Sequence, residues 1–205
     1  MEELLFRNDI MGTDIHAFLE HRDNRGSFSG RSDDPAFFFA KFALARDYLL
    51  FDALAGVRSR QFSSDDRGFA PLHEPRGIPD DLSLDVAWEY YDLIIEDGYP
   101  DPRFWPAPGC ISMEEAETRP RVDRHFISQT MFVGTSPPRS WSLVVKRNWF
   151  AASWLYLGEV TASLQHHYVS LGNLSWESRV LLASLSNIEE HLGHERARLV
   201  FWFSS

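Results

Sequence analysis

The sequence predicts an α+β fold in which strands from the two ends of the chain share one sheet. Near the start, residues 12–22 alternate between apolar and polar side chains, as a strand with one buried face does. Near the end, "ARLVFWF" (197–203) is almost wholly apolar and rich in aromatic residues, which is typical of a buried strand. Segments with helical spacing lie between them. We expect a single domain with a central, mostly antiparallel sheet that includes the first and last strands, with packed helices.

The first strand has two different faces. Ile15, Ala17 and Leu19 form the apolar face, and the opposite face carries Asp14, His16, Phe18 and Glu20. The ten residues before Met11, "MEELLFRNDI", do not clearly belong to this pattern. We therefore expect an N-terminal extension over 1–10 and the domain over 11–205.

The first half of the chain is expected to continue with two helices. Apolar spacing predicts one from Pro35 to Val57, ending near Gly56. A loop dense in Gly, Pro, Ser and Asp follows. A second helix is predicted over Leu84–Glu96, with Ser83 or Asp81 as its N-cap.

The second half is expected to hold a strand and two helical regions. Residues 97–109 contain four prolines and are expected to be irregular, and a short helix is predicted over 113–117. "SWSLVVK" (140–146) indicates a strand, and residues 149–168 are expected to be helical in part. The last helix begins after Ser175, has Leu181, Leu185, Ile188 and Leu192 on one stripe, and ends at Gly193.

Composition excludes several classes of protein. The formal net charge of −10 argues against generic nucleic-acid binding, which needs a basic surface. No apolar run is long enough to span a membrane, and we see no secretory signal. The single cysteine, Cys110, suits a reducing cytoplasm. Only Lys41 and Lys146 are lysines among the 20 basic residues, so arginine dominates, which suits recognition of phosphate or carboxylate or reflects a GC-rich genome.

Two segments carry candidate site residues. Asp14 and His16 project from one face of the first strand, where they could share a metal or form an acid–base pair. Otherwise they belong to a solvated strand face with a capping or salt-bridged pair. The stiff loop "HEPRGIPDD" (73–81) carries Glu74 and Arg76, which either bind a ligand or belong to a structural turn. In that turn Arg76 would clamp backbone carbonyls or a helix C-terminus, and Asp81 would cap a helix.

Two further arginines lie on the first predicted helix. Arg46 and Arg58 are twelve residues apart, about 18 Å along a helix, and so cannot grip one phosphate together. Either could join Arg76 from a neighbouring element, although Arg58 would also suit a helix C-terminus.

Four segments resemble a known family. "MGTDIHAFLEHRD", "ARDYLLFDALAGVR", "EPRGIPDDLS" and "ARLVFWF" are similar, in that order, to uncharacterised proteins of bacteriophages and bacteria. Those open with MG-x-DIH, carry RNYDLF-x-x-LA-x-VR and EPRGLP-x-D motifs, and end on a VR-x-V-F-x-FD strand. Asp47 replaces the family's Asn, and Ser204 its final acidic residue. The resemblance implies a domain start near Met11 and no function, and it marks Asp14, His16, Arg46, Arg58, Glu74 and Arg76.

We carry three hypotheses of function. The first is a phage-type protein that binds or sequesters a small anionic ligand, most simply a nucleotide or nucleotide-derived immune signal, through the six marked residues. The second is a phosphodiesterase-like hydrolase that acts on a nucleotide, in which Asp14, His16 and Glu74 are metal ligands or an acid–base pair. In this hypothesis Arg76 steadies the phosphoryl charge. The third is an acidic protein that inhibits a host protein. The sequence names no cofactor, and a homo-oligomer is compatible with each.

Overall fold

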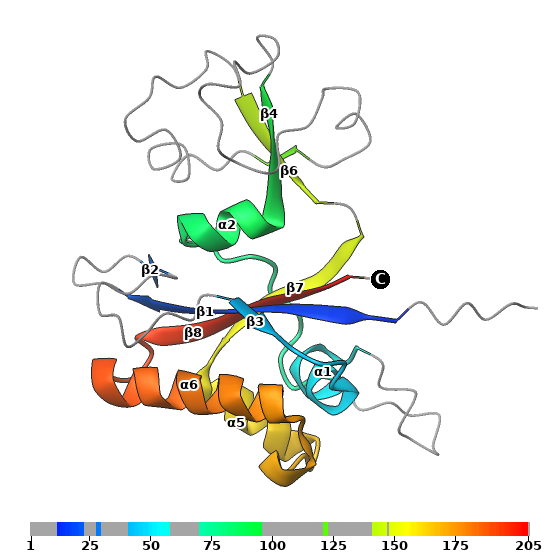
Figure 1. Cartoon of the computed structure of the whole chain (residues 1–205), viewed down its shortest axis with the longest axis vertical. Coiled ribbons are helices and arrows are strands. Elements are labelled where there is room, and N and C mark those ends of the chain that lie inside the picture. The colour runs from blue at the N-terminus through cyan, green and yellow to red at the C-terminus, as the bar shows by residue number, and fades with distance from the viewer. Residues whose placement is uncertain are drawn as a thin grey trace, which may run out of the picture.

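The computed structural model describes residues 12–22, 28–29, 41–57, 70–95, 121–122, 141–146 and 148–204. Its main sheet has the strand order β2-β1-β8-β7, with β3 also paired to β1, and every pairing is antiparallel. The strands are β1 (Asp14–Arg22), β2 (Phe28–Ser29), β3 (Lys41–Ala43), β7 (Trp149–Tyr156) and β8 (Ala197–Ser204). The first and last strands are neighbours at the centre of the sheet (Figure 1). The predicted α+β fold is confirmed.

Strands β1 and β8 are the two central strands of the main sheet. They pair along their whole length, from Asp14 opposite Ser204 to His21 opposite Ala197. All residues of β8 from Ala197 to Phe203 are buried, as the apolar sequence predicts.

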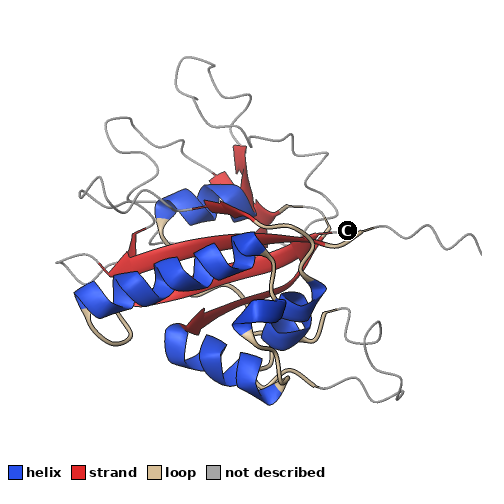
Figure 2. Ribbon diagram, turned by 60° about the horizontal axis from the view of Figure 1, so that its bottom comes forward, coloured by secondary structure: helices blue, strands red, loops and turns tan. Residues whose placement is uncertain are grey.

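One face of the sheet packs against three helices. These are α1 (Tyr48–Ala55), α5 (Leu157–His166) and α6 (Trp176–Leu192), which lie together on one side (Figure 1 and Figure 2). Ile15, Ala17 and Leu19 point into this core, as their alternation predicts. The stripe of α6 supplies Leu181, Leu185 and Ile188 to the same core.

The opposite face of the sheet has a second core. Phe18, Val200 and Trp202 pack there against α2 (Leu84–Tyr90) and the first residue of β4 (Tyr91–Ile95). Strand β4 belongs to a small antiparallel sheet of order β4-β6-β5, with β6 at Trp141–Val145 and β5 at Arg121–Val122. Because this face is covered too, β1 is buried on both sides from Phe18 to Glu20. The alternation of apolar and polar residues in β1 indicates burial on one side only.

The predicted helix from Pro35 to Val57 is wrong over residues 41–47, the first part of it that the structure describes. Lys41–Ala43 form β3, which pairs with residues 16–18 of β1, and the helix begins only at Tyr48. The free edge of β1 offers backbone hydrogen bonds to the segment, and the Asp47 side chain then accepts the Leu50 N–H at 3.3 Å to start the helix. Arg46 therefore precedes the helix instead of lying on it.

The second predicted helix is too long. It ends at Tyr90, and Tyr91–Ile95 form β4 instead, paired with β6. Aromatic and β-branched residues favour this, because they fit a pleated surface that a partner strand completes. Ser83, not Asp81, is the N-cap, and its Oγ accepts the Val86 N–H at 3.4 Å.

The remaining predictions fall in three groups. The strand over 140–146 and the helix after Ser175 are confirmed as β6 and α6, and Gly193 follows α6 with a φ of 100°. Residues 149–168 are a strand before they are a helix, since β7 precedes α5; a 3-10 turn at Leu171–Asn173 then leads to α6. The extension 1–10, residues 97–109, the helix at 113–117 and Arg58 lie outside the described residues.

In the described part, none of the helices has the length and apolar character needed to cross a membrane.

Candidate functional site

Asp14 and Arg46 form a surface pair at the start of β1. Arg46 Nε donates to Asp14 Oδ1 at 2.8 Å, with both side chains more than half exposed. Gly12 makes room for this contact, because a Cβ there would lie 1.9 Å from Arg46 Nη1. This part of the first motif thus forms a salt-bridged pair on a solvated face, one of the two expected alternatives.

His16 lies two residues further along the same face and contacts Ser204. Its Nε2 is 3.0 Å from Ser204 Oγ on the adjacent strand β8. The imidazole stacks on Trp202, with ring centroids 5.7 Å apart and planes 14° from parallel, and its other neighbour is Trp149 at 5.2 Å. The two indoles hold the ring in one orientation.

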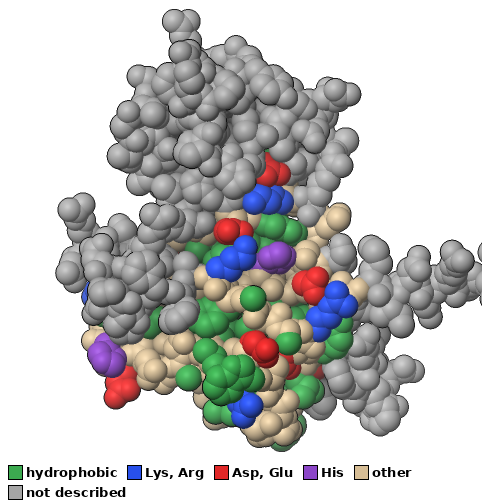
Figure 3. Space-filling view, in the orientation of Figure 1, with side chains coloured by type: hydrophobic (Ala, Val, Ile, Leu, Met, Phe, Trp, Pro, Cys, Tyr) green, Lys and Arg blue, Asp and Glu red, His purple; other side chains and the backbone are tan. Residues whose placement is uncertain are grey.

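Charged side chains surround the imidazole. Lys41 Nζ is 2.8 Å from Glu89 Oε2, and Lys146 Nζ lies 5.3 Å from the Trp149 ring centre. Burial and the Lys41 charge lower the pKa of His16 below its ordinary value, against the opposing effect of Asp14. Figure 3 shows basic and acidic side chains gathered with a histidine on this side of the molecule. We call it the His16 face, made up of Asp14, His16, Lys41, Glu89, Lys146, Trp149, Trp202 and Ser204.

The loop that carries Glu74 and Arg76 docks on β7. The Gly77 N–H donates to the Ala152 carbonyl at 2.9 Å, and the Arg76 N–H donates to Ser153 Oγ at 3.2 Å. A β-bulge interrupts the pairing of β7 with β8 between Phe150 and Ser153, which leaves this part of β7 available to the loop. Gly77 has a φ of 77°, a conformation that favours glycine.

Arg76 binds a carboxylate at the start of α5. Its Nη1 and Nη2 donate to the two carboxylate oxygens of Glu159, and its guanidinium lies 5.0 Å from the Trp154 ring centre. Burial raises the pKa of Glu159, but hydrogen bonds from Arg76 and from the Tyr156 N–H outweigh it and leave the pKa below its ordinary value. Arg76 thus clamps a carboxylate, and not the backbone carbonyls or the helix C-terminus that the structural-turn interpretation predicts.

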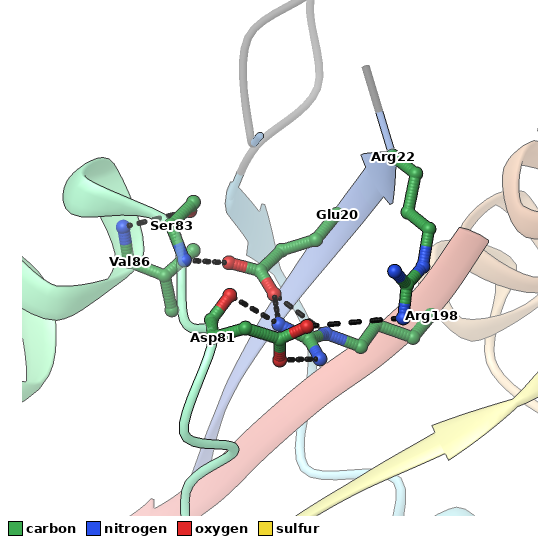
Figure 4. Close-up of polar contacts among 6 residues, drawn as sticks. All are labelled: Glu20, Arg22, Asp81, Ser83, Val86 and Arg198. Atoms are coloured by element: carbon green, nitrogen blue, oxygen red, sulfur yellow. Dashed lines mark hydrogen bonds and ion pairs between the residues drawn. The ribbon is translucent and has the colours of Figure 1, made fainter. Parts of the chain in front are cut away.

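An ion cluster that the sequence did not predict lies at the end of this loop, where a buried Glu20–Arg198 pair meets the exposed Asp81. Arg198 Nη2 is 2.6 Å from Glu20 Oε2, and Arg198 Nη1 is 2.6 Å from Asp81 Oδ1. Glu20 also accepts the Ser83 N–H at 2.7 Å (Figure 4). The available signal was an arginine inside the apolar stretch "ARLVFWF", which needs a buried partner.

A pocket opens next to this cluster. It has a volume of about 340 Å³ and lies between the loop, β7 and the ends of β1 and β8. We call it the arginine pocket, and its principal lining residues are Arg22, Arg76, Arg198, Asp81, Trp154 and Tyr156. Among the predicted site residues that the structure describes, Arg76 alone lines it.

The predicted site residues for which the structure gives a position, all but Arg58, therefore do not form one cluster. Asp14, His16 and Arg46 lie at the start of β1, whereas the arginine pocket adjoins its other end, where Glu20 faces Arg198. Within the described residues, Glu74 is exposed and no hydrogen bond or ion pair joins it to Asp14 or His16. The described residues also contain no group of three His, Cys, Asp or Glu side chains that could hold a metal ion.

Comparisons of the chain with protein-family models, with curated proteins and with solved structures found no match. Function must therefore be inferred from the geometry of the two polar regions.

Proposed function

We propose that the protein binds a small anionic ligand in the arginine pocket, and that this ligand is a nucleotide or a nucleotide-derived signal. One observation carries the proposal: three guanidinium groups and two aromatic rings line a single cavity of about 340 Å³. That volume lies in the range of small-molecule sites, about 300–1,000 Å³. Guanidinium groups recognise phosphate with paired hydrogen bonds, which compact ammonium groups cannot reproduce.

Arg76 is the residue best placed to take a phosphate oxygen. Its side chain is 32% exposed, and its ion pair with Glu159 uses one N–H from each terminal nitrogen. A guanidinium has five N–H groups, so three remain for a ligand. The Trp154 ring packs against the Arg76 guanidinium and restricts its motion. Less side-chain entropy is therefore lost when a ligand binds.

The other two arginines have different roles. The side chain of Arg22 lines the pocket, is 36% exposed and forms an ion pair with Asp81, with Nη2 3.8 Å from Oδ2. Arg22 therefore adds positive charge to the pocket wall. Arg198 is 2% exposed and is held by Glu20 and Asp81, so it fixes the pocket wall.

Aromatic rings favour a nucleotide over a simple anion. Trp154 and Tyr156 meet edge to face in the pocket wall, with centroids 5.4 Å apart. A nucleobase can stack on a tyrosine ring or on the plane of a guanidinium. Asp80 and Asp81 also line the pocket and would repel an extended polyanion, so the site suits a short ligand. A reducing cytoplasm, as a host cell would provide, is the compartment we expect.

The proposal is tested by isothermal titration calorimetry with AMP, ATP and inorganic phosphate. We expect the wild type to bind a nucleotide and Arg76→Ala to bind it at least about tenfold more weakly, the loss of one charge-assisted contact. Arg46→Ala is the matched control, since Arg46 is also paired with a carboxylate but lies outside the pocket. Absence of binding by the wild type, or equal weakening in both variants, would overturn the proposal.

A further inference from the structure

We propose that His16 and Ser204 form a second functional site, a base–nucleophile pair that cleaves small carboxylic esters on the His16 face. The pair is separate from the arginine pocket and does not depend on ligand binding there. Its central observation is the 3.0 Å distance between His16 Nε2 and Ser204 Oγ, the reach that a histidine base needs to activate a serine hydroxyl.

The sheet fixes the two residues relative to each other. In the β1–β8 ladder, Asp14 lies opposite Ser204 and His16 lies opposite Trp202. His16 and Ser204 are therefore diagonal neighbours on adjacent strands, with both side chains on the same face. A site built on paired strands is held more rigidly than one built on loops.

The imidazole is oriented by aromatic rings. Trp202 lies 14° from parallel to it at 5.7 Å and Trp149 lies 5.2 Å away, and because the two indoles are 5.0 Å from each other, both pack against the same side of the imidazole. In many serine hydrolases a carboxylate orients the histidine. Here the indoles supply the orientation, and Asp14, on the same face, supplies negative charge that stabilises the imidazolium formed during reaction.

The protonation state of His16 suits a base. Burial and the Lys41 charge keep the pKa of His16 below its ordinary value and so favour the neutral imidazole, which acts as a base in the tautomer whose Nε2 accepts from Ser204 Oγ. The charged groups that face the ring are Lys41 from β3, Glu89 from α2, Lys146 at the end of β6 and Asp14 from β1.

The proposed reaction is acyl transfer to Ser204. Ser204 Oγ attacks the ester carbonyl carbon while its proton passes to His16 Nε2. The carbon–oxygen bond to the alcohol then breaks, and the alcohol leaves with the proton from His16. Water, activated by the same Nε2, adds to the acyl-serine and releases the carboxylic acid and free Ser204.

Labelling with diisopropyl fluorophosphate tests the pair directly. The reagent forms a phosphorus–oxygen bond with an activated serine and releases fluoride, and peptide mapping by mass spectrometry locates the adduct. We expect the adduct on Ser204 in the wild type, none there in Ser204→Ala, and labelling at least about 100-fold slower in His16→Phe. The wild type should also hydrolyse p-nitrophenyl acetate, with activity that falls as His16 becomes protonated.

Two controls separate the possible outcomes. Ser184→Ala should label like the wild type, because Ser184 Oγ donates to the Val180 carbonyl and not to a histidine. The second control is calorimetry of nucleotide binding, measured separately on the wild type, so that failure of the nucleotide proposal leaves this one intact. His16→Asn serves if His16→Phe is not folded, as judged by circular dichroism. An unlabelled Ser204 in the folded wild type, or equal labelling in a folded His16 variant, would overturn the proposal.

Discussion

Glu20 on β1 and Arg198 on β8 lie directly opposite each other and form an ion pair that solvent does not reach. The side chains are 0% and 2% exposed, and Arg198 Nη2 is 2.6 Å from Glu20 Oε2. Glu20 also accepts the Ser83 N–H, and Arg198 also holds the side chain and carbonyl of Asp81. The pair therefore joins the centre of the main sheet to the segment that leads from the arginine pocket into α2.

Breaking this pair should destabilise the protein strongly. Glu20→Gln leaves the Arg198 charge buried with less compensation, which typically costs about 3–5 kcal/mol. Urea unfolding followed by tryptophan fluorescence measures the change. The control is Asp14→Asn, which removes one partner of an exposed pair and should cost at most about 1 kcal/mol. Replacing both partners, as in Glu20→Met with Arg198→Met, should recover part of the loss; equal costs for Glu20→Gln and Asp14→Asn would contradict the prediction.

Asp47 should contribute to the stability of two helices. Its Oδ1 accepts the Leu50 N–H at 3.3 Å, and its Oδ2 accepts the Ser175 N–H at 2.7 Å at the start of α6. Asp47→Ala removes both acceptors, and at about 1 kcal/mol for each we expect a loss of about 2 kcal/mol in the free energy of unfolding. Chemical denaturation measures it. A loss no larger than that of Asp14→Ala would show that the buried carboxylate does not cap the helices.

The ion pair between Glu159 and Arg76 should give stability that depends on pH. Hydrogen bonds from Arg76 and Tyr156 outweigh burial and place the pKa of Glu159 below 4.5, its ordinary value. A lowered pKa means that the stabilisation is complete above about pH 4.5 and is lost as the pH falls through the folded-state pKa. Melting temperatures of wild type and Glu159→Gln should therefore differ most above pH 4.5 and converge below it. Parallel profiles would contradict this.

His16 should titrate below its ordinary pKa of 6.5, because burial and the Lys41 charge disfavour the imidazolium. Lys41→Met should raise the pKa of His16, since it removes a nearby positive charge and leaves Glu89 without that partner. NMR titration of the histidine ring signals measures both values. Arg179→Met, on the helix side of the sheet, is the control and should leave the His16 titration unchanged. A lower pKa in Lys41→Met would reverse the assigned role of Lys41.

Local sequence patterns were sufficient to predict the elements whose conformation does not depend on what they pack against. The alternation of Ile15, Ala17 and Leu19 identified β1 and its core face, and the leucine stripe with its Ser175 cap identified α6. In both cases the buried residues recur with the repeat of the secondary structure itself. The nearby sequence is therefore enough to predict the element.

The tertiary structure alone decided the segments whose conformation depends on a distant partner. Lys41–Ala43 could continue a helix, but the edge of β1 makes them a strand, and β6 does the same for Tyr91–Ile95. The candidate sites follow the same rule. The sequence by itself marked His16 and Arg76 as polar positions of interest, whereas strand pairing placed Ser204 beside His16 and Glu20 beside Arg198. The reason is physical: these contacts join residues almost the full chain apart, and only the antiparallel register of β1 and β8 fixes which side chains meet.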